Sequence, residues 1–267
     1  MTLLITLNYF NMRDKYESQY KDILWECLAK GIHRDDRTGV GCKSIFNASL
    51  KIDVSKYFPV LTGRKMFQKT FYTEFEWFMN GETNIQRFRD AGVKIWDAWA
   101  DENGDLGPVY GHQMRNFNDQ NVDQMQILIK DIMLNPDSRR HIISLWNPAQ
   151  LNQMQLPPCY LYFQFFVDND KLNMFVVQRS GDLFLGIPYD VALFTKILLY
   201  VADLTRLKAN FLDIQIIDAH IYDNQHDAIH KYLAQDNFDL PEYVVENGAL
   251  ILINYKHGPV ITAKVAI

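Results

Sequence analysis

Hydrophobic residues recur along the chain with the spacing of helices in four segments. Between residues 14 and 30 apolar side chains return every three or four positions, and Gly31 follows as a stop signal. The same spacing predicts helices over 70–79 and 122–134. Residues 186–201 are apolar nearly all round, so we expect a helix there that runs through the middle of the fold.

Other segments show the short apolar runs and the alternation that are typical of strands. Strands are expected over 46–54, 141–146, 161–167, 172–177 and 212–216. The sequence Asp-Asn-Asp-Lys at 168–171 has turn residues, so the strands on either side of it should pair antiparallel. Strands interleaved with helices, without a repeat or a linker, predict one α+β domain over residues 1–267 with a mixed sheet flanked by helices.

Two polar stretches interrupt this pattern. Residues 33–41 are charged and bounded by glycines, and Arg37-Thr38-Gly39 within them has the chemistry to wrap an anion. Residues 95–110 combine two tryptophans with glycine, proline and acids, which predicts a long irregular loop of the kind that lines pockets.

Composition narrows the class of protein. A hydrophobic content of 48% with 22% charged residues is ordinary for a globular protein, and no apolar run reaches the ~18 residues of a membrane span. The first residues lack the features of a signal peptide, and three unpaired cysteines favour a reducing cytoplasm. The net charge of −5 disfavours nonspecific binding to nucleic acid, and the three cysteines form no Cys-x-x-Cys pair of the kind that binds zinc.

Cys159 is the cysteine whose surroundings suggest chemistry. Pro157 and Pro158 fix the backbone before it, a buried strand follows it, and the returning strand leads to the polar cluster 178–182. A rigidly held thiol near an arginine, whose charge favours the thiolate, has what a nucleophile needs. For an arbitrary cysteine a buried structural role is the commoner reading.

Several motifs, in order over nearly the whole chain, resemble those of the thymidylate synthase family. They are Ile95-Trp-Asp-Ala-Trp99, Gly104–Gly111, Asp137-Ser-Arg-Arg140, Gln155-Leu-Pro-Pro-Cys159, Gln178-Arg-Ser-Gly-Asp182, Phe184–Pro188, Asp218-Ala-His-Ile-Tyr222 and the final Val-Ala-Ile. The resemblance implies the fold of that family, a homodimer, a deoxynucleoside monophosphate as substrate and 5,10-methylenetetrahydrofolate as cofactor. It also implies that the Cys159 thiolate adds to C6 of a pyrimidine, which makes C5 nucleophilic.

The same resemblance assigns roles to further residues. The nucleotide would be bound by Arg37, Gln178, Arg179, Ser180, Asp190, His220 and Tyr222, and by Arg139 and Arg140 reaching in from the second subunit. Proton transfer would involve Glu74 and Tyr110. The folate would contact Trp96, Trp99, Leu156, Asp182, Gly186 and Ala266, with Arg64 or Lys65 at its glutamate tail; the family has that basic pair in the opposite order.

Two positions depart from the pattern of the synthases. Asp190 stands where they have asparagine, and Tyr160 stands where they have histidine. An amide offers one donor and one acceptor, which fits N3–H and O4 of uracil. On cytosine that edge is reversed, and a carboxyl group can accept from the 4-amino group while a shared proton satisfies N3. The family's deoxycytidylate hydroxymethylases have aspartate at the position of Asp190.

These residues favour conversion of dCMP to 5-hydroxymethyl-dCMP. Formation of dTMP from dUMP, or of 5-methyl-dCMP, stays open, because Trp96 and the Val-Ala-Ile end resemble the synthases. A catalytically silent nucleic-acid-binding regulator is disfavoured by the acidic charge and by the intact Cys159, Arg179 and Asp182. A cysteine hydrolase is a weaker alternative, since no histidine is placed by sequence as its base.

Overall fold

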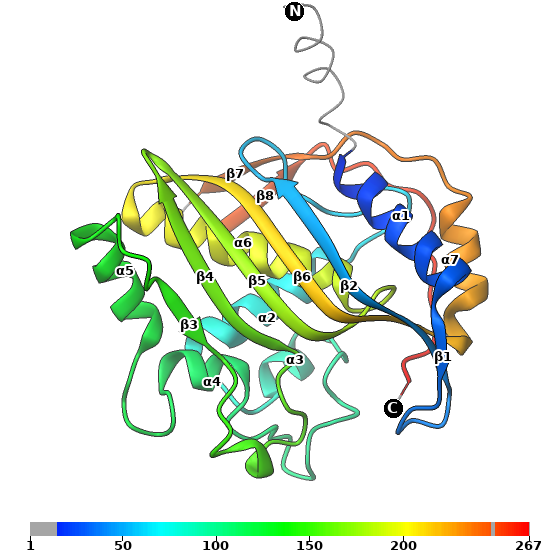
Figure 1. Ribbon diagram of the computed structural model, residues 1–267, viewed down its shortest axis with the longest axis horizontal. Helices are drawn as coiled ribbons and strands as arrows, with labels where there is room; N and C mark the ends of the chain where they lie inside the picture. Colours follow the sequence, from blue (N-terminus) through cyan, green and yellow to red (C-terminus); the bar gives the residue numbers. More distant parts are fainter. Residues whose placement is uncertain (1–14, 247–248, 267) are drawn as a thin grey trace, which may run out of the picture.

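A six-stranded mixed sheet organises the protein (Figure 1). The computed structural model describes residues 15–246 and 249–266. The sheet order is β1-β2-β6-β5-β4-β3. The strands are β1 (Ile32–Arg34), β2 (Cys42–Asp53), β3 (Ile142–Ser144), β4 (Tyr160–Asp168), β5 (Lys171–Asp182) and β6 (Lys208–Tyr222).

The pairing of β5 with β6 is parallel, while the other neighbours in this sheet are antiparallel. Parallel strands end at the same edge, so Ser180 lies beside Asp218 and Asp182 beside His220. The antiparallel partner β4 begins at this edge, where Tyr160 pairs with Gln178. Segments that are far apart in sequence therefore deliver their polar ends to one place.

One face of the sheet is covered by two long helices, α2 (Gln68–Asn80) and α6 (Ile187–Thr205) (Figure 1). Most of α6 is buried, as its continuous apolar pattern predicts. The helix α2 places Phe71, Phe75 and Phe78 in the core and ends at Gly81, whose φ of 65° is the left-handed conformation that favours glycine.

Smaller elements surround these layers. They are α1 (Lys15–Lys30), α3 (Gln86–Asp90), α4 (Tyr110–Arg115), α5 (Gln124–Leu134), α7 (His226–Leu233), two 3₁₀ turns at Leu151–Gln153 and Asp223–Gln225, and a hairpin of β7 (Glu242–Glu246) with β8 (Ala249–Ile253). In Figure 1 the hairpin lies behind the sheet, and α1 and α7 lie together at one side.

Most expected elements are confirmed, with shifted ends. The expected helices correspond to α1, α2, α5 and α6, and the expected strands to β2, β3, β4, β5 and β6. Residue 14, where the first helix was expected to begin, lies outside the described residues. The expectation of a loop from residue 33 is wrong for its first positions, which belong to the edge strand β1. All three side chains of β1 are exposed, so no apolar pattern marks it.

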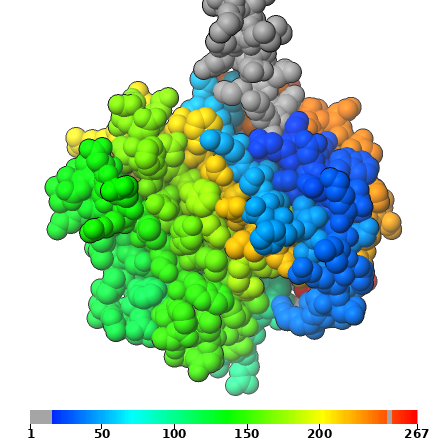
Figure 2. Space-filling view, in the orientation of Figure 1, coloured from blue at the N-terminus to red at the C-terminus, as the bar shows by residue number. Residues whose placement is uncertain are grey.

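The other face of the sheet has no helix across β4, β5 and β6 in the part of the chain that the structure describes (Figure 1). Figure 2 shows this face directly. Apolar side chains lie open there, with Phe166 64% exposed, Ile142 45% exposed and Ile217 37% exposed. Among the described helices none is long and apolar enough to cross a membrane.

Candidate active site

A cavity of about 340 Å³ opens at the sheet edge where β5 and β6 end. Its lining includes Arg37, Glu74, Trp96, Trp99, Tyr110, Leu156, Cys159, Tyr160, Arg179, Ser180, Asp182, Gly186, Asp190, His220, Tyr222 and Ala266. Residues expected at a site from sequence thus meet in one enclosed space of ligand size.

Cys159 is held from two sides at the start of β4. The Arg179 backbone N–H donates to its carbonyl (2.8 Å), and its own N–H donates to the Tyr110 hydroxyl (3.1 Å). The Arg179 guanidinium also donates to the carbonyls of Pro157 and Pro158, each at 2.9 Å. Pro157 and Pro158, together with Arg179 on the neighbouring strand, therefore position the thiol.

The surroundings of Cys159 shift the pKa of its thiol in opposite directions. Burial raises the pKa of Cys159, and the negative charge of Asp190 acts in the same direction. The positive charge of Arg179 lowers this pKa, as expected from sequence, but it does not outweigh burial. The thiol must therefore lose a proton before or during attack on a substrate.

Tyr110 combines a strained backbone with complete burial. Its φ of 33° is unusual for a residue other than glycine, and its side chain is 2% exposed. Strain of this kind persists where the surroundings over-determine it, often at functional sites. Burial raises the pKa of Tyr110 well above its ordinary value, so its hydroxyl keeps its proton beside Cys159.

Glu74 is a buried acid on α2, while Glu76 on the same helix is exposed. Its carboxyl accepts a hydrogen bond from the Trp96 indole N–H at 3.2 Å. Burial and the charge of Asp190 raise the pKa of Glu74 to about 8. An acid with this pKa can give or take a proton near neutral pH.

Asp190 lies in the first turn of α6 and faces the cavity. The Tyr160 hydroxyl donates to its Oδ1, and the Gln178 amide nitrogen donates to its Oδ2 at 2.8 Å. Burial raises the pKa of Asp190 to about 7, although both hydrogen bonds act to lower it. Gln178 itself is completely buried and does not line the cavity, so it acts here through Asp190.

The basic and hydroxyl groups gather at one end of the lining. Arg37 comes from the loop after β1, Arg179 and Ser180 from β5, and His220 and Tyr222 from β6. Burial acts to lower the pKa of His220, but the hydrogen bond with Asp218 and the charges of Asp182 and Asp218 outweigh it and raise that pKa. This cationic end suits an anionic ligand with hydroxyl groups.

Apolar groups also line the cavity. Trp96 and Trp99 stack edge to face at 5.9 Å between ring centroids, and Leu156, Gly186 and Ala266 belong to the same lining. The carboxyl of Asp182 is fixed by the backbone N–H groups of Phe184 and Leu185 and by the amide nitrogen of Gln225. The indole N–H of Trp99 is buried without a partner. A flat heterocycle with polar edges, such as a pterin, fits this combination.

Arg139 and Arg140 do not join the cavity of their own chain. Both are exposed in the segment between α5 and β3. The final residue of the expected Val-Ala-Ile end, at position 267, lies outside the described residues, whereas Val265 and Ala266 reach the lining.

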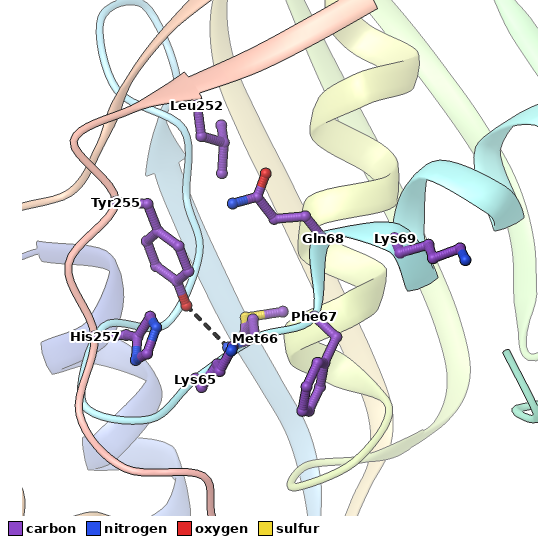
Figure 3. Close-up of a pocket in the computed structure, with 8 residues that line it drawn as sticks. All are labelled: Lys65, Met66, Phe67, Gln68, Lys69, Leu252, Tyr255 and His257. Carbon is purple, nitrogen blue, oxygen red and sulfur yellow. Dashed lines mark hydrogen bonds between the residues drawn. The ribbon is translucent and has the colours of Figure 1, made fainter. Parts of the chain in front are cut away.

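The structure distinguishes the two basic residues at 64 and 65. Arg64 is 4% exposed and lies 4.2 Å over the ring of Phe184, so it is a packed core residue. Lys65 lines a separate hollow with Lys69 and His257, which Figure 3 shows between the start of α2 and the C-terminal segment. Tyr255 anchors that segment by accepting from the Met66 N–H at 2.9 Å.

Several lining residues were not expected from sequence, namely Thr70, Ile95, Leu185 and Tyr189. Tyr189 precedes Asp190, and its hydroxyl accepts from the Phe67 N–H at 3.3 Å, which ties α6 to the segment of Figure 3. Its place directly before Asp190 is the one feature of the sequence that could have marked Tyr189 as a site residue. Within the described residues no group of three His, Cys, Asp or Glu side chains is arranged to hold a metal ion.

Comparison with known families decides the assignment. The family model described as thymidylate synthase matches residues 18–267, nearly the whole chain. The chain belongs to the thymidylate synthase family. Members of this family transfer a one-carbon unit from a methylenetetrahydrofolate-type folate to C5 of a pyrimidine nucleotide. The protein is therefore a one-carbon transferase, and its mixed sheet with flanking helices is the α+β fold of the family.

Proposed function

We propose that this member of the thymidylate synthase family acts on dCMP and forms 5-hydroxymethyl-dCMP with 5,10-methylenetetrahydrofolate. The observation that carries the proposal is the carboxyl group of Asp190 in the wall of the cavity that contains Cys159. At this position an acid, and not an amide, meets the Watson–Crick edge of the base.

The chemistry of that edge supports cytosine. Its 4-amino group donates to one carboxyl oxygen, and a proton shared between the other oxygen and N3 completes the pair. Because burial raises the pKa of Asp190 to about 7, such a proton is accessible near neutral pH. A polar mismatch left in a buried site costs about 1–3 kcal/mol, which is enough to set a preference between two bases.

The residues of the cavity then divide the work. The Cys159 sulfur bonds to C6 of the base, the C5–C6 π electrons become nucleophilic at C5, and the thiol proton leaves to a base of the site. Glu74, with a pKa near 8, moves protons at the 4-substituent in this proposal, and Tyr110 does so at C5; both line the cavity. Arg37, Arg179 and Ser180 hold the phosphate, and His220 and Tyr222 hold the sugar.

The folate supplies the one-carbon unit at the oxidation level of formaldehyde when it is bound. Trp96, Trp99, Leu156 and Gly186 form its apolar surroundings, and Asp182 accepts from the edge of its pterin. Lys65 and the hollow in Figure 3 offer positive charge for the glutamate tail. Lys69 of that hollow precedes Thr70 of the cavity lining, and the Phe67 N–H of the hollow donates to the hydroxyl of Tyr189 in that lining.

A methyl product is the second candidate, and a specific observation favours it. Trp96 is 8% exposed, and Val265 and Ala266 reach the lining, so the cavity has groups that shield an intermediate from water. Capture by water gives the hydroxymethyl product and tetrahydrofolate, whereas capture of a hydride from the folate gives a methyl product and dihydrofolate.

The proposal includes a homodimer with shared phosphate sites. The open sheet face carries exposed apolar residues, and the exposed Arg139 and Arg140 lie near β3 at the border of that face. Arg179 lines the cavity and also a hollow on the open face, together with Ile142 and Tyr162. A partner seated on this face would bring its arginines to the phosphate end of the cavity.

One experiment tests substrate and product together. The protein is incubated with methylenetetrahydrofolate and equal concentrations of dCMP and dUMP, and product mass and folate oxidation state are read. We expect faster loss of dCMP, a product heavier than dCMP by CH₂O, and no dihydrofolate. A product heavier by CH₂, with dihydrofolate, would establish the methyl outcome.

Asp190→Asn tests the base-reading role. The amide offers one donor and one acceptor, so the preference should move toward dUMP by about tenfold or more. Tyr160 stands where the synthases have histidine, so we expect the change in base preference to be incomplete. Faster turnover of dUMP than of dCMP by the wild type would show that Asp190 does not select cytosine.

A further inference from the structure

Three residues from three elements form a hydrogen-bonded group at the wall of the cavity. Tyr160 of β4 and Gln178 of β5 are paired in the sheet register, and Asp190 lies in the first turn of α6. The Tyr160 hydroxyl donates to Oδ1 of Asp190 and the Gln178 amide to Oδ2. Each oxygen of the carboxyl group thus has its own donor.

Neither donor is free to turn away. Tyr160 is 4% exposed, and its ring lies 4.7 Å from that of Phe194 and 5.0 Å from that of Tyr110. Gln178 is completely buried. Packed side chains in a core keep single rotamers, so the carboxyl group of Asp190 is restrained in rotation as well as in position.

We infer that Tyr160 determines base specificity, because its hydroxyl favours the ionised form of the Asp190 carboxyl and holds it in one orientation until a base binds. The inference rests on the proposed function, in which Asp190 reads the base. It adds a residue that does not itself need to contact the nucleotide, and so a positioning role.

A restrained carboxylate and a free carboxylic acid offer a base different hydrogen-bonding groups. A free acid has one donor and one acceptor, and a half turn exchanges them, so it can satisfy cytosine or uracil equally. A restrained carboxylate presents two acceptors. Cytosine can answer them with its 4-amino group and with a proton taken up at N3, a basic ring nitrogen. Uracil presents O4 there, a carbonyl oxygen that is far less basic.

Other groups also shift the pKa of the Asp190 carboxyl, each in a definite direction. Burial raises the pKa of Asp190 most, the hydrogen bonds from Tyr160 and Gln178 lower it, and the charge of Asp182 raises it. The remaining ionisable groups coupled to Asp190 are Tyr16 of α1, Glu74 of α2, Tyr110 of α4 and Cys159 before β4. Loss of the Tyr160 hydroxyl removes one lowering contribution, so the pKa of Asp190 rises.

Tyr160→Phe tests the inference, with Tyr200→Phe as the matched control. Tyr200 lies on the same helix as Asp190, packs against Phe75 and does not line the cavity. Binding of dCMP and of dUMP is measured by calorimetry from about pH 7 to about pH 9, above the phosphate titration that both nucleotides share. Buffers of different ionisation enthalpy report the protons taken up.

In Tyr160→Phe we expect the pH midpoint of dCMP binding to rise and the proton uptake at the upper end to fall. The ratio of dUMP to dCMP dissociation constants should fall about tenfold, the loss of one hydrogen bond to a charged group. Tyr200→Phe should match the wild type. Should Tyr160→Phe not fold, Gln178→Leu removes the other donor and should move the midpoint the same way.

An unchanged midpoint and an unchanged ratio in a folded Tyr160→Phe variant would overturn the inference and leave the proposed function standing. A wild type that binds dUMP as tightly as dCMP would overturn the proposed base preference. The two failures are thus separate measurements.

Discussion

Cys159, Glu74 and Asp190 share one cavity, and burial raises the pKa of each. Burial therefore works against a negative charge on all three groups, and Glu74, which would be ionised in water near neutral pH, keeps its proton. The positive charge of the cavity comes from Arg37 and Arg179. An anionic nucleotide can enter such a site without meeting a set of unpaired carboxylates, and the retained protons are available for transfer once the base is bound.

Cys159→Ala should fold, bind nucleotide and lose turnover, because no other cysteine among the described residues reaches the cavity. Cys42→Ala is the control, since Cys42 is buried on β2 outside the lining and should be dispensable for chemistry. Turnover is followed by product formation and binding by calorimetry. If Cys159→Ala turned over substrate as fast as the wild type, covalent catalysis by this thiol would be refuted.

Glu74→Gln should change stability in a pH-dependent manner. The pKa of Glu74 rises from 4.5 to about 8 on folding, so between these values the unfolded chain releases a proton that the folded chain keeps. Wild-type stability therefore falls as pH rises through this window, at up to about 1.4 kcal/mol per unit of pKa difference. The variant lacks this loss and gains stability relative to wild type at pH 8, but not at pH 4.

Urea unfolding at the two pH values measures that gain, with Glu76→Gln as control on the exposed side of the same helix. Equal differences between Glu74→Gln and wild type at both pH values would contradict the burial argument. Activity should fall in Glu74→Gln, since the amide cannot transfer a proton.

At the scale of elements, the site depends on a close approach of α4 to α2. A Cβ added at Gly111 would lie 2.5 Å from the carbonyl oxygen of Phe78 and 2.8 Å from its Cα. Gly111→Ala should therefore push α4 outward, cost about 1–3 kcal/mol of stability and lower kcat, because Tyr110 then leaves Cys159. Urea unfolding measures the loss of stability, and steady-state kinetics measure kcat. An unchanged kcat in a destabilised variant would show that catalysis does not depend on the position of α4.

The sequence predicted the elements that carry a clear pattern of apolar residues. The strands β4 and β5, joined at 168–171, and the buried helix α6 follow from apolar pattern alone. The edge strand β1 and the short α4 could not be predicted that way, because β1 buries nothing and α4 is too short for a period to show.

For the site, the sequence motifs identified the residues but not their contacts. Asp190 was expected to read a base, yet its bond to Tyr160 joins residues 30 positions apart and needs the register of β4 with β5 and the entry of α6. The net direction of the pKa shift of Cys159 could not be predicted from the sequence for a related reason. Arg179 is near, but burial, which sequence neighbours do not reveal, has the larger effect.

For the whole molecule, the uncovered sheet face and the unused arginines point to the same arrangement. Apolar residues over β3, β4 and β6 are exposed on one face, which is unusual for a monomer when they are contiguous. The net charge of −5 makes local arginines more conspicuous, and Arg139 and Arg140 lie outside their own cavity. A two-fold dimer would bury the face and give each pair of arginines a phosphate.

Mixing inactive variants tests this arrangement. An Arg140→Ala chain keeps its own cysteine, and a Cys159→Ala chain keeps its arginine, so a heterodimer of the two contains one intact site if Arg140 acts across the interface. After random exchange about a quarter of the sites should be active. Mixing Arg179→Ala with Cys159→Ala is the control, because Arg179 lines the cavity of its own chain and should not complement Cys159→Ala. Here the intact arginine and the intact cysteine are on different chains, and no site recovers both. Restored activity in the first mixture alone would establish that phosphate binding is shared, whereas heterodimers shown to form without activity would assign Arg140 to the surface.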